Sequence, residues 1–576
     1  MLASLFKKYQ KRKWEILLFC FIIALGIFLR TYNFSDWLLF EIDQSYDTLI
    51  VSRAIEDGIE NLPLLGPTAG GGRALRLGPI FYYMEYVSAF VFGDTPVGHA
   101  MLVLTLSLLS MPLFYIFIRR YFNTRISLAL LAIFSISAYL VLYGRFSWSP
   151  NVLPFLVLLS WYALLRSVSE TEVRRDRWFL IATVAITIAS QIHFNAFFTI
   201  PTIAILFLLY KRPKFHWKTW VIAIGIVLAI YSPMILSDWS TGGENIGFFT
   251  KKISKTNESP LGLLTNFPKK FMTDMNYTAS GYFLINSGID HINGKRVREY
   301  GFQHDEHLPW RIFAILLFVT QMSILLWNIF TEKTVGRKDF LILTLLWISI
   351  PFIYFYSLIS SSFQIYPRFF LLLAPAGIIL LGLLFEKISS EKKIVRCVIL
   401  SFVVFLLLIP NLTRIRAHFE TLNNPKSNTS VVETEDIFPN NKRLTLREQV
   451  AITDYLFEKQ SRNHYLVYFD AIHEYEPVFW YHLSRKGVSY SNRINENHLY
   501  AEGNYFRIQY STEGIGRTLR ESFTILDKKD FGVLTVYTLR PKQHNITSLR
   551  QAPEKKKFLE QTLQIQALST WETLLK

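Results

Sequence analysis

The sequence predicts an α-helical polytopic membrane protein with a small C-terminal α/β domain. Of the 576 residues, 51% are hydrophobic and 48 are Phe. Runs such as 14–29 and 101–118 are long enough, at about 1.5 Å of rise per residue, to cross a hydrocarbon core about 30 Å thick. After residue 411 the long apolar runs end, and helical and strand patterns alternate. That alternation is typical of a small α/β domain.

About 11 membrane spans are predicted. They cover residues 14–30, 97–118, 126–143, 150–167, 178–192, 194–210, 217–236, 309–330, 339–358, 366–385 and 394–411. We therefore expect a membrane module over 1–411, with long extracytoplasmic loops at 31–96 and 237–308, and the α/β domain over 412–576. The first span is longer than the apolar core of a signal peptide, and the small-residue cleavage pattern does not follow it.

The net charge of +17 reports topology rather than a nucleic-acid partner. Lys and Arg gather in alternate connections between the spans, and the short connections between those are almost free of them. This is the positive-inside pattern, which places the N-terminus in the cytoplasm. With an odd number of spans the C-terminal domain is then extracytoplasmic, outside the plasma membrane if the source is bacterial. Cys20 and Cys397 both lie in predicted spans, so we expect no structural disulfide.

Shorter elements are predicted outside the spans. In the first long loop, the patterns at 46–57 and 80–92 indicate two helices lying along the membrane surface. In the C-terminal region, helices are expected at 444–462 and 475–485, and strands at 464–470, 505–510 and 531–539.

An acidic stretch opens the first long loop. Glu41, Asp43 and Asp47 stand just after the first span. Carboxylates beside a membrane boundary are costly and therefore favour a functional role. Three short connections, 143–151, 190–195 and 360–368, are predicted to emerge on the same side of the membrane.

These features resemble the GT-C superfamily of glycosyltransferases, in the branch of protein O-mannosyltransferases and lipid A aminoarabinose transferases. The matching motifs are the acidic stretch, the segment 78–83 running to Phe92-Gly93, and the late-span pattern 366–370 followed by Ala374-Pro375. The resemblance covers roughly residues 14–411. It implies sugar transfer from a polyprenyl-phosphate carrier to an acceptor outside the cytoplasm. Two positions depart from the family: Gln44 stands where a Glu is frequent, and His99 where an Arg is frequent.

Asp43 is the predicted catalytic base. A phosphate leaving group departs already ionised, so one base that deprotonates the acceptor suffices, and attack from the opposite face inverts the anomeric carbon. The alternative is that Asp43 only caps the helix at 46–57. Asp47, one helical turn later, is expected to orient the acceptor or raise the basicity of Asp43. No cofactor or metal is predicted, although Glu41 and Asp43 could contribute to a divalent-cation site.

The other candidate residues are predicted to bind the substrates. Arg368 and Arg145 are the candidates for the carrier phosphate, because guanidinium groups match phosphate oxygens and stabilise the departing charge. Interfacial snorkelling is the alternative for both. The remaining candidates for the sugar, phosphate or prenyl chain are Glu41, Arg73, Arg76, His193, Tyr82 and Tyr83. Packing of His193 between helices and an interfacial aromatic belt for the tyrosines remain open.

We therefore expect an inverting membrane glycosyltransferase that uses a polyprenyl-phosphate-linked sugar and a cell-envelope glycan, lipid or protein as acceptor. Two alternatives remain. One is a carrier or flippase for lipid-linked saccharides, although carriers usually place polar groups at the bilayer midplane. The other is a non-catalytic envelope assembly protein that binds a partner through its α/β domain.

Overall fold

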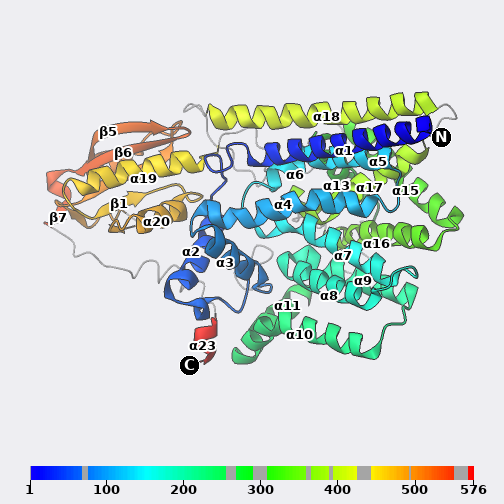
Figure 1. Cartoon of the computed structure of the whole chain (residues 1–576). Helices are drawn as coiled ribbons and strands as arrows, with labels where there is room; N and C mark the ends of the chain where they lie inside the picture. Colours follow the sequence, from blue (N-terminus) through cyan, green and yellow to red (C-terminus); the bar gives the residue numbers. More distant parts are fainter. Residues whose placement is uncertain are drawn as a thin grey trace.

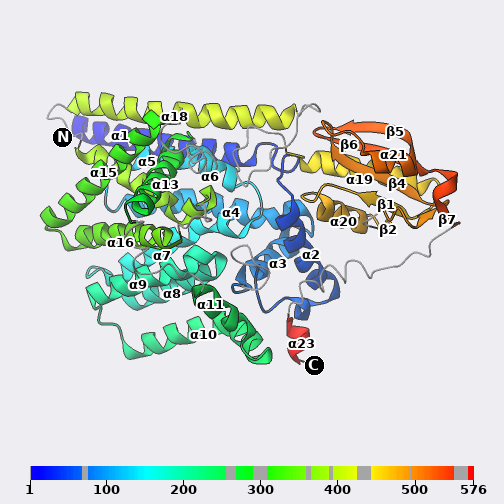
Figure 2. The ribbon, with the colours of Figure 1, turned by 180° about the vertical axis from the view of Figure 1, so that it is seen from behind.

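The protein is an elongated helical bundle with a small sheet domain joined to one end (Figures 1 and 2). The computed structural model describes residues 2–67, 76–254, 267–289, 308–358, 365–387, 393–424, 443–491, 494–549 and 569–575. The N-terminal end of α1 lies at the end of the bundle away from the sheet domain. The predicted fold class is confirmed.

Within the described residues, nine helical segments are long and apolar enough to cross a membrane, so the chain is an integral membrane protein. They are α1 (Leu2–Thr31), α4 (Pro96–Ile118), η2 with α7 (Ser149–Val152 and Leu153–Val168), α9 (Phe194–Lys211), α10 (Trp217–Ser240), α15 (Leu308–Thr331), α16 (Val335–Leu358), η4 with α17 (Pro367–Leu373 and Ala374–Lys387) and α18 (Lys393–Asn423). The two other predicted spans are also helical. Residues 126–143 form α5 (Thr124–Ile136) and α6 (Ala138–Tyr143), and residues 178–192 lie in α8 (Arg175–Ile192).

Ser137 divides the predicted span 126–143 into two helices. Its hydroxyl donates to the Ile285 carbonyl at 2.6 Å, and its side chain caps the first turn of α6. The next backbone N–H, of Ala138, donates to Asn411 Oδ1 at 2.7 Å. The break is therefore made by partners from distant parts of the chain.

The segment 237–308, expected to be a polar loop, contains α11 (Glu244–Ser254) and α13 (Phe267–Ser287). Most of α13 is buried among α15, α16, α17 and α18. One end of α13 packs Phe267 on Tyr356, and the other packs Phe283 on Phe313, with ring centroids 5.8 Å apart in both pairs. Both contacts lie at the ends of α15 and α16 that face away from their own connection. The polar residues of α13 lower its mean hydropathy, so the hydropathy pattern did not predict a buried helix here.

The basic connections meet at the end of the bundle away from the sheet domain. Arg337 donates to the carbonyl of Tyr121 after α4 and pairs with Glu386 near the end of α17. Lys211, the last residue of α9, lies 2.8 Å from Asp339 at the start of α16. This geometry matches the alternation of charge along the sequence.

The C-terminal domain is a mixed five-stranded sheet with helices. Its elements are α19 (Leu446–Ser461), β1 (Val467–Asp470), α20 (Glu476–Arg485), β2 (Tyr490–Ser491), β4 (Asn504–Tyr510), α21 (Arg517–Ser522), β5 (Phe523–Phe531) and β6 (Leu534–Pro541), with a separate pair formed by β3 (Leu499–Tyr500) and β7 (Ile546–Ser548). The strand order is β2-β1-β4-β6-β5, parallel around β1 and antiparallel around β6. Residue 411, the predicted domain boundary, lies inside α18, which continues to Asn423.

The first long loop carries two helices, as predicted. They are α2 (Ile42–Asp57) and α3 (Ile80–Phe92), separated by η1 (Ile59–Asn61). Both lie where the bundle meets the sheet domain (Figure 1). The last helix, α23 (Trp571–Leu575), returns to this loop, where the indole N–H of Trp571 donates to the hydroxyl of Tyr83 at 2.9 Å.

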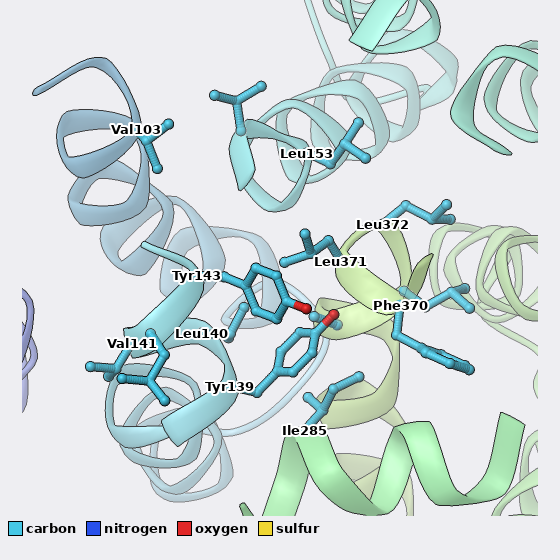
Figure 3. Packing of buried hydrophobic residues seen from close by; sticks show 14 of the residues in the cluster. Val103, Tyr139, Leu140, Val141, Tyr143, Leu153, Ile285, Phe370, Leu371 and Leu372 are labelled. Carbon is cyan, nitrogen blue, oxygen red and sulfur yellow. The ribbon is translucent and has the colours of Figure 1, made fainter. Parts of the chain in front are cut away.

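A layer of buried side chains holds η4 in place (Figure 3). Tyr139 and Tyr143 of α6 project toward Leu371, and the Tyr139 hydroxyl donates to the carbonyl of Pro367 at 2.7 Å. From the other side, α13 approaches η4 through Gly281. A Cβ at this glycine would lie only 2.6 Å from the ring of Phe370. The close approach of α13 therefore fixes the position of the segment that carries Arg368.

We expect Gly281→Ala to destabilise the protein, because the added methyl must displace the Phe370 ring in a packed core. Overpacking of this kind costs about 1–3 kcal/mol of unfolding free energy. Thermal unfolding in detergent measures the effect. Gly225→Ala is the matched control, since a Cβ at this helical glycine meets nothing within 4 Å. Equal unfolding temperatures for the two variants would contradict the packing described here.

Candidate active site

The acidic stretch forms the first turn of α2. The helix begins at Ile42, and Glu41 is its N-cap, with Gln44 accepting the Glu41 backbone N–H at 3.1 Å in a capping box. Asp43 therefore does not cap the helix, and its side chain is exposed. The capping role that the sequence allowed for Asp43 belongs to Glu41.

Asp47 lies one turn beyond Asp43 and is buried, with 8% of its surface exposed. Tyr82 of α3 is a hydrogen-bond partner of its carboxyl group, and Arg76 is a cationic neighbour. Burial, followed by the nearby charges of Glu85 and Asp43, raises the pKa of Asp47 well above its ordinary value. Asp47 thus lies in a desolvated environment one helical turn beyond the exposed Asp43.

Glu85 is a second buried carboxyl group in this cluster, and the sequence reasoning missed it. It lies on α3, one turn after Tyr82, and is 1% exposed. Its Oε1 accepts from the hydroxyl of Ser147, and burial raises its pKa. The available signal was a lone carboxylate inside the apolar helix 80–92, which is costly unless partners satisfy it.

His99, where the family frequently has an arginine, belongs to the same cluster. It is fully buried at the start of α4, and its Nε2 lies 3.0 Å from Asp94 Oδ1. The same Asp94 oxygen accepts from the hydroxyl of Ser52 on α2 at 2.6 Å. His99 is also an electrostatic neighbour of Glu85.

Arg368 stands in η4 inside a frame of aromatic rings. Its guanidinium carbon lies 5.2 Å from the ring centroid of Trp148, 4.8 Å from that of Tyr366 and 5.6 Å from that of Phe369. Cation–π contacts of this kind hold a guanidinium in place. The arginine is only partly buried, so an approaching ligand can reach it.

His193 lies beside Arg368. It precedes α9 and hydrogen-bonds Asn195, whose side-chain amide donates to the carbonyl of Phe369 at 3.0 Å. Burial lowers the pKa of His193 to about 4, and the Arg368 charge acts in the same direction. A neutral imidazole at this position can hydrogen-bond a sugar hydroxyl or a phosphate oxygen.

Two links join the acidic cluster around Asp47 and Glu85 to the Arg368 cluster, which consists of Arg368, the rings around it and His193. Ser147, bonded to Glu85, directly precedes Trp148, whose ring packs on Arg368. Gly78, just before α3, lies so close to Gln191 that a Cβ there would meet its Oε1 at 2.0 Å. The short connections 143–151 and 190–195 and the described residues 365–368 of the third therefore converge.

Four other candidates are held by contacts within the protein. Arg145 donates to the carbonyls of Leu29, Arg30 and Tyr32, and so caps α1. The Tyr83 hydroxyl donates to the Pro63 carbonyl at 2.9 Å. The Arg76 backbone exchanges two hydrogen bonds with Asn245, and Glu41 accepts from the hydroxyl of Tyr475 at 3.1 Å. Arg73 lies outside the described residues. The described part of the chain has no group of three or more His, Cys, Asp or Glu side chains that could hold a metal.

Comparisons with known proteins bear on the fold that carries this site. Residues 76–236 match the model of the family described as dolichyl-phosphate-mannose-protein mannosyltransferase. The structure is similar to that of ArnT from Cupriavidus metallidurans bound to undecaprenyl phosphate, with a TM-score of 0.50, 11% sequence identity, and coverage of 94% of this chain and 99% of that one. The chain has a GT-C fold. The apo state of the same ArnT gives a TM-score of 0.49 at 11% identity, covering 92% of this chain and 98% of that one. No curated protein sequence matches the chain.

The raised pKa of Asp47 predicts how stability depends on pH. The folded state holds this proton more tightly than the unfolded state, whose carboxyl titrates near 3.8. The free energy of unfolding therefore falls as pH rises above about 4, by up to about 1.4 kcal/mol per pH unit, until the folded carboxyl ionises. Asp47→Asn cannot ionise, so it should unfold at a higher temperature than the wild type at pH 8 and at the same temperature near pH 4.

The matched control is Asp57→Asn, at the exposed end of the same helix. This variant should keep the wild-type dependence of unfolding temperature on pH. A wild-type dependence in Asp47→Asn as well would show that Asp47 is not the buried proton-holding group.

Proposed function

We propose that this chain is an inverting membrane glycosyltransferase that uses a polyprenyl-phosphate-linked sugar. One observation carries the proposal. At one end of a GT-C bundle, the exposed carboxyl group of Asp43 on α2 is linked to the aromatic-framed Arg368 by a chain of contacts through the buried Asp47 and Glu85 and the segment 147–148. The undecaprenyl phosphate bound to ArnT, a protein of similar fold, supports the class of donor carrier. The acceptor is a cell-envelope glycan, lipid or protein.

Asp43 is the base in this proposal. The acceptor hydroxyl transfers its proton to Asp43, and its oxygen forms a bond to the anomeric carbon. The bond from that carbon to the phosphate oxygen breaks, and the polyprenyl phosphate departs with the electron pair. Attack opposite the leaving group inverts the anomeric centre. Burial raises the pKa of Asp47 and of Glu85, and Asp43 is the exposed carboxyl group of the three, which favours Asp43 for this role.

Arg368 binds the departing phosphate in the same scheme. The attraction between its positive charge and the leaving oxygen grows as negative charge develops on that oxygen. Arg368 therefore stabilises the transition state more than the bound donor. His193 and Asn195 are within the same group of contacts and supply neutral hydrogen-bonding groups. Tyr82 supports the base indirectly through Asp47.

The membrane orientation is part of the proposal. The basic connections lie at the end of the bundle away from the sheet domain, and Lys and Arg are retained on the cytoplasmic side. The N-terminus is then cytoplasmic, and the C-terminal domain and Asp43 face the extracytoplasmic side, at the plasma membrane in a bacterium.

We expect Asp43→Asn to lose at least about a hundredfold in transfer rate, since it removes the general base. The measurement is transfer from labelled polyprenyl-phosphate sugars to a crude envelope acceptor fraction in proteoliposomes. NMR of the product gives the anomeric configuration. Asp57→Asn, matched in helix and chemistry, should retain wild-type transfer. Full activity in Asp43→Asn would exclude it as the base. Movement of intact donor across the bilayer without transfer would favour the carrier alternative.

Arg368→Met should weaken the donor side of the reaction. The methionine keeps apolar packing against the aromatic rings but cannot pair with phosphate, so kcat/KM for the donor should fall about a hundredfold. A polyprenyl phosphate should also raise the unfolding temperature of the wild type and not that of the variant. Arg416→Met, which replaces an exposed arginine of α18, is the control. A wild-type thermal shift in Arg368→Met would place the phosphate elsewhere.

A further inference from the structure

The C-terminal domain hydrogen-bonds to the backbone of the segment that leads into α2. The backbone N–H of Arg447 donates to the carbonyl of Asp36 at 3.2 Å. The side chain of Arg443 donates to the Trp37 carbonyl at 3.2 Å, and that of Gln449 to the Phe40 carbonyl at 2.7 Å. These three bonds fix the backbone immediately before the acidic stretch to the start of the sheet domain.

Tyr475 continues these contacts to the first residue of the acidic stretch. It is 1% exposed, and its hydroxyl accepts from the backbone N–H of Leu444 at 3.0 Å and donates to Glu41 Oε1 at 3.1 Å. Glu41 caps α2 and stands two residues before Asp43. The orientation of the cap, and with it the first turn of the helix, therefore depends on a hydroxyl supplied by the C-terminal domain.

Arg485, the last residue of α20, holds the other end of α2. Its guanidinium pairs with Glu56 in the last turn of α2 and lies 3.0 Å from Asp94 Oδ2, and it donates to the Asp94 carbonyl at 2.9 Å. Asp94 in turn binds Ser52 of α2 and His99 of α4. The Arg485–Glu56 pair is exposed and contributes modestly by itself. Arg485 instead matters for geometry, because its contacts with Glu56 and Asp94 connect α2 to the start of α4.

The helix needs this support. It has 16 residues, close to the length at which an isolated helix is marginal in water. Irregular chain precedes it, and Gly58, with φ of 117°, follows it. It packs against α3 of the membrane module and α20 of the C-terminal domain.

We propose that the C-terminal domain is a positioning clamp for the acidic helix, with Tyr475 and Arg485 as the positioning residues at its two ends. The proposal rests on the proposed function, because the group being positioned is Asp43. A misplacement of about 1 Å in a reacting group can cost about a hundredfold in rate. The clamp therefore acts on the chemical step rather than on donor binding, which belongs to Arg368.

Tyr475→Phe in the full-length protein tests the clamp. It removes only the hydroxyl that orders Glu41. We expect kcat for sugar transfer to fall about tenfold, with the donor KM within about twofold of wild type. Tyr490→Phe is the matched control, because this partly buried tyrosine hydrogen-bonds Ser484 within the same domain. Arg485→Gln should give a smaller loss of the same kind.

Hydrogen–deuterium exchange gives a second measurement that needs no enzymatic activity. Amides of residues 42–57 should exchange at least about fivefold faster in Tyr475→Phe than in the wild type or Tyr490→Phe. Faster exchange together with the loss in kcat supports the clamp. Faster exchange with no transfer by the wild type from any donor would retain the clamp and reject the proposed function. Unchanged exchange in residues 42–57 would overturn the clamp, whatever the activity.

Discussion

The burial of two carboxyl groups, Asp47 and Glu85, is the constraint on which this site depends. A carboxylate removed from water must be hydrogen-bonded or protonated, and each partner it recruits fixes another segment of chain. Asp47 draws in Tyr82 of α3, and Glu85 draws in Ser147 from the connection before α7. Since the next residue, Trp148, packs on Arg368, the same constraint extends from the proposed base to the arginine proposed to bind phosphate. The acidic helix and the late span are coupled although more than three hundred residues separate them.

The membrane bundle provides the rigid support for this coupling. Breaks in helices occur where the site is built: Ser137 ends α5 so that α6 can present Tyr139 to η4, and the 3-10 turn of η4 presents Arg368. Irregular backbone at these depths is tolerated only when other protein groups satisfy it. The buried α13 fills that role on one side, through the Ile285 carbonyl and the close approach of Gly281 to Phe370.

The C-terminal domain is more than an appendage in this arrangement. It contacts the membrane module along the chain that carries the proposed base, through Tyr475 at one end of α2 and Arg485 at the other. A mobile acidic segment would sample many geometries, so an external support reduces the entropy to be lost when substrates bind. This gives a physical reason for the chain to continue past its last span into a folded domain.

The sequence by itself determined the membrane class, the alternation of basic connections, both helices of the first long loop and the C-terminal α/β domain. These follow from hydropathy, charge and period, which are local properties. It could not determine contacts between distant segments. Tertiary structure alone decided that Glu41 rather than Asp43 caps α2, that Arg145 caps α1, and that Glu85 belongs to the acidic cluster. It also placed α13 in the core and made the charged segment 523–531 an edge strand. For Arg145 and Glu85 the partner comes from a segment far away in the sequence, so the residues adjacent to each side chain do not predict the contact.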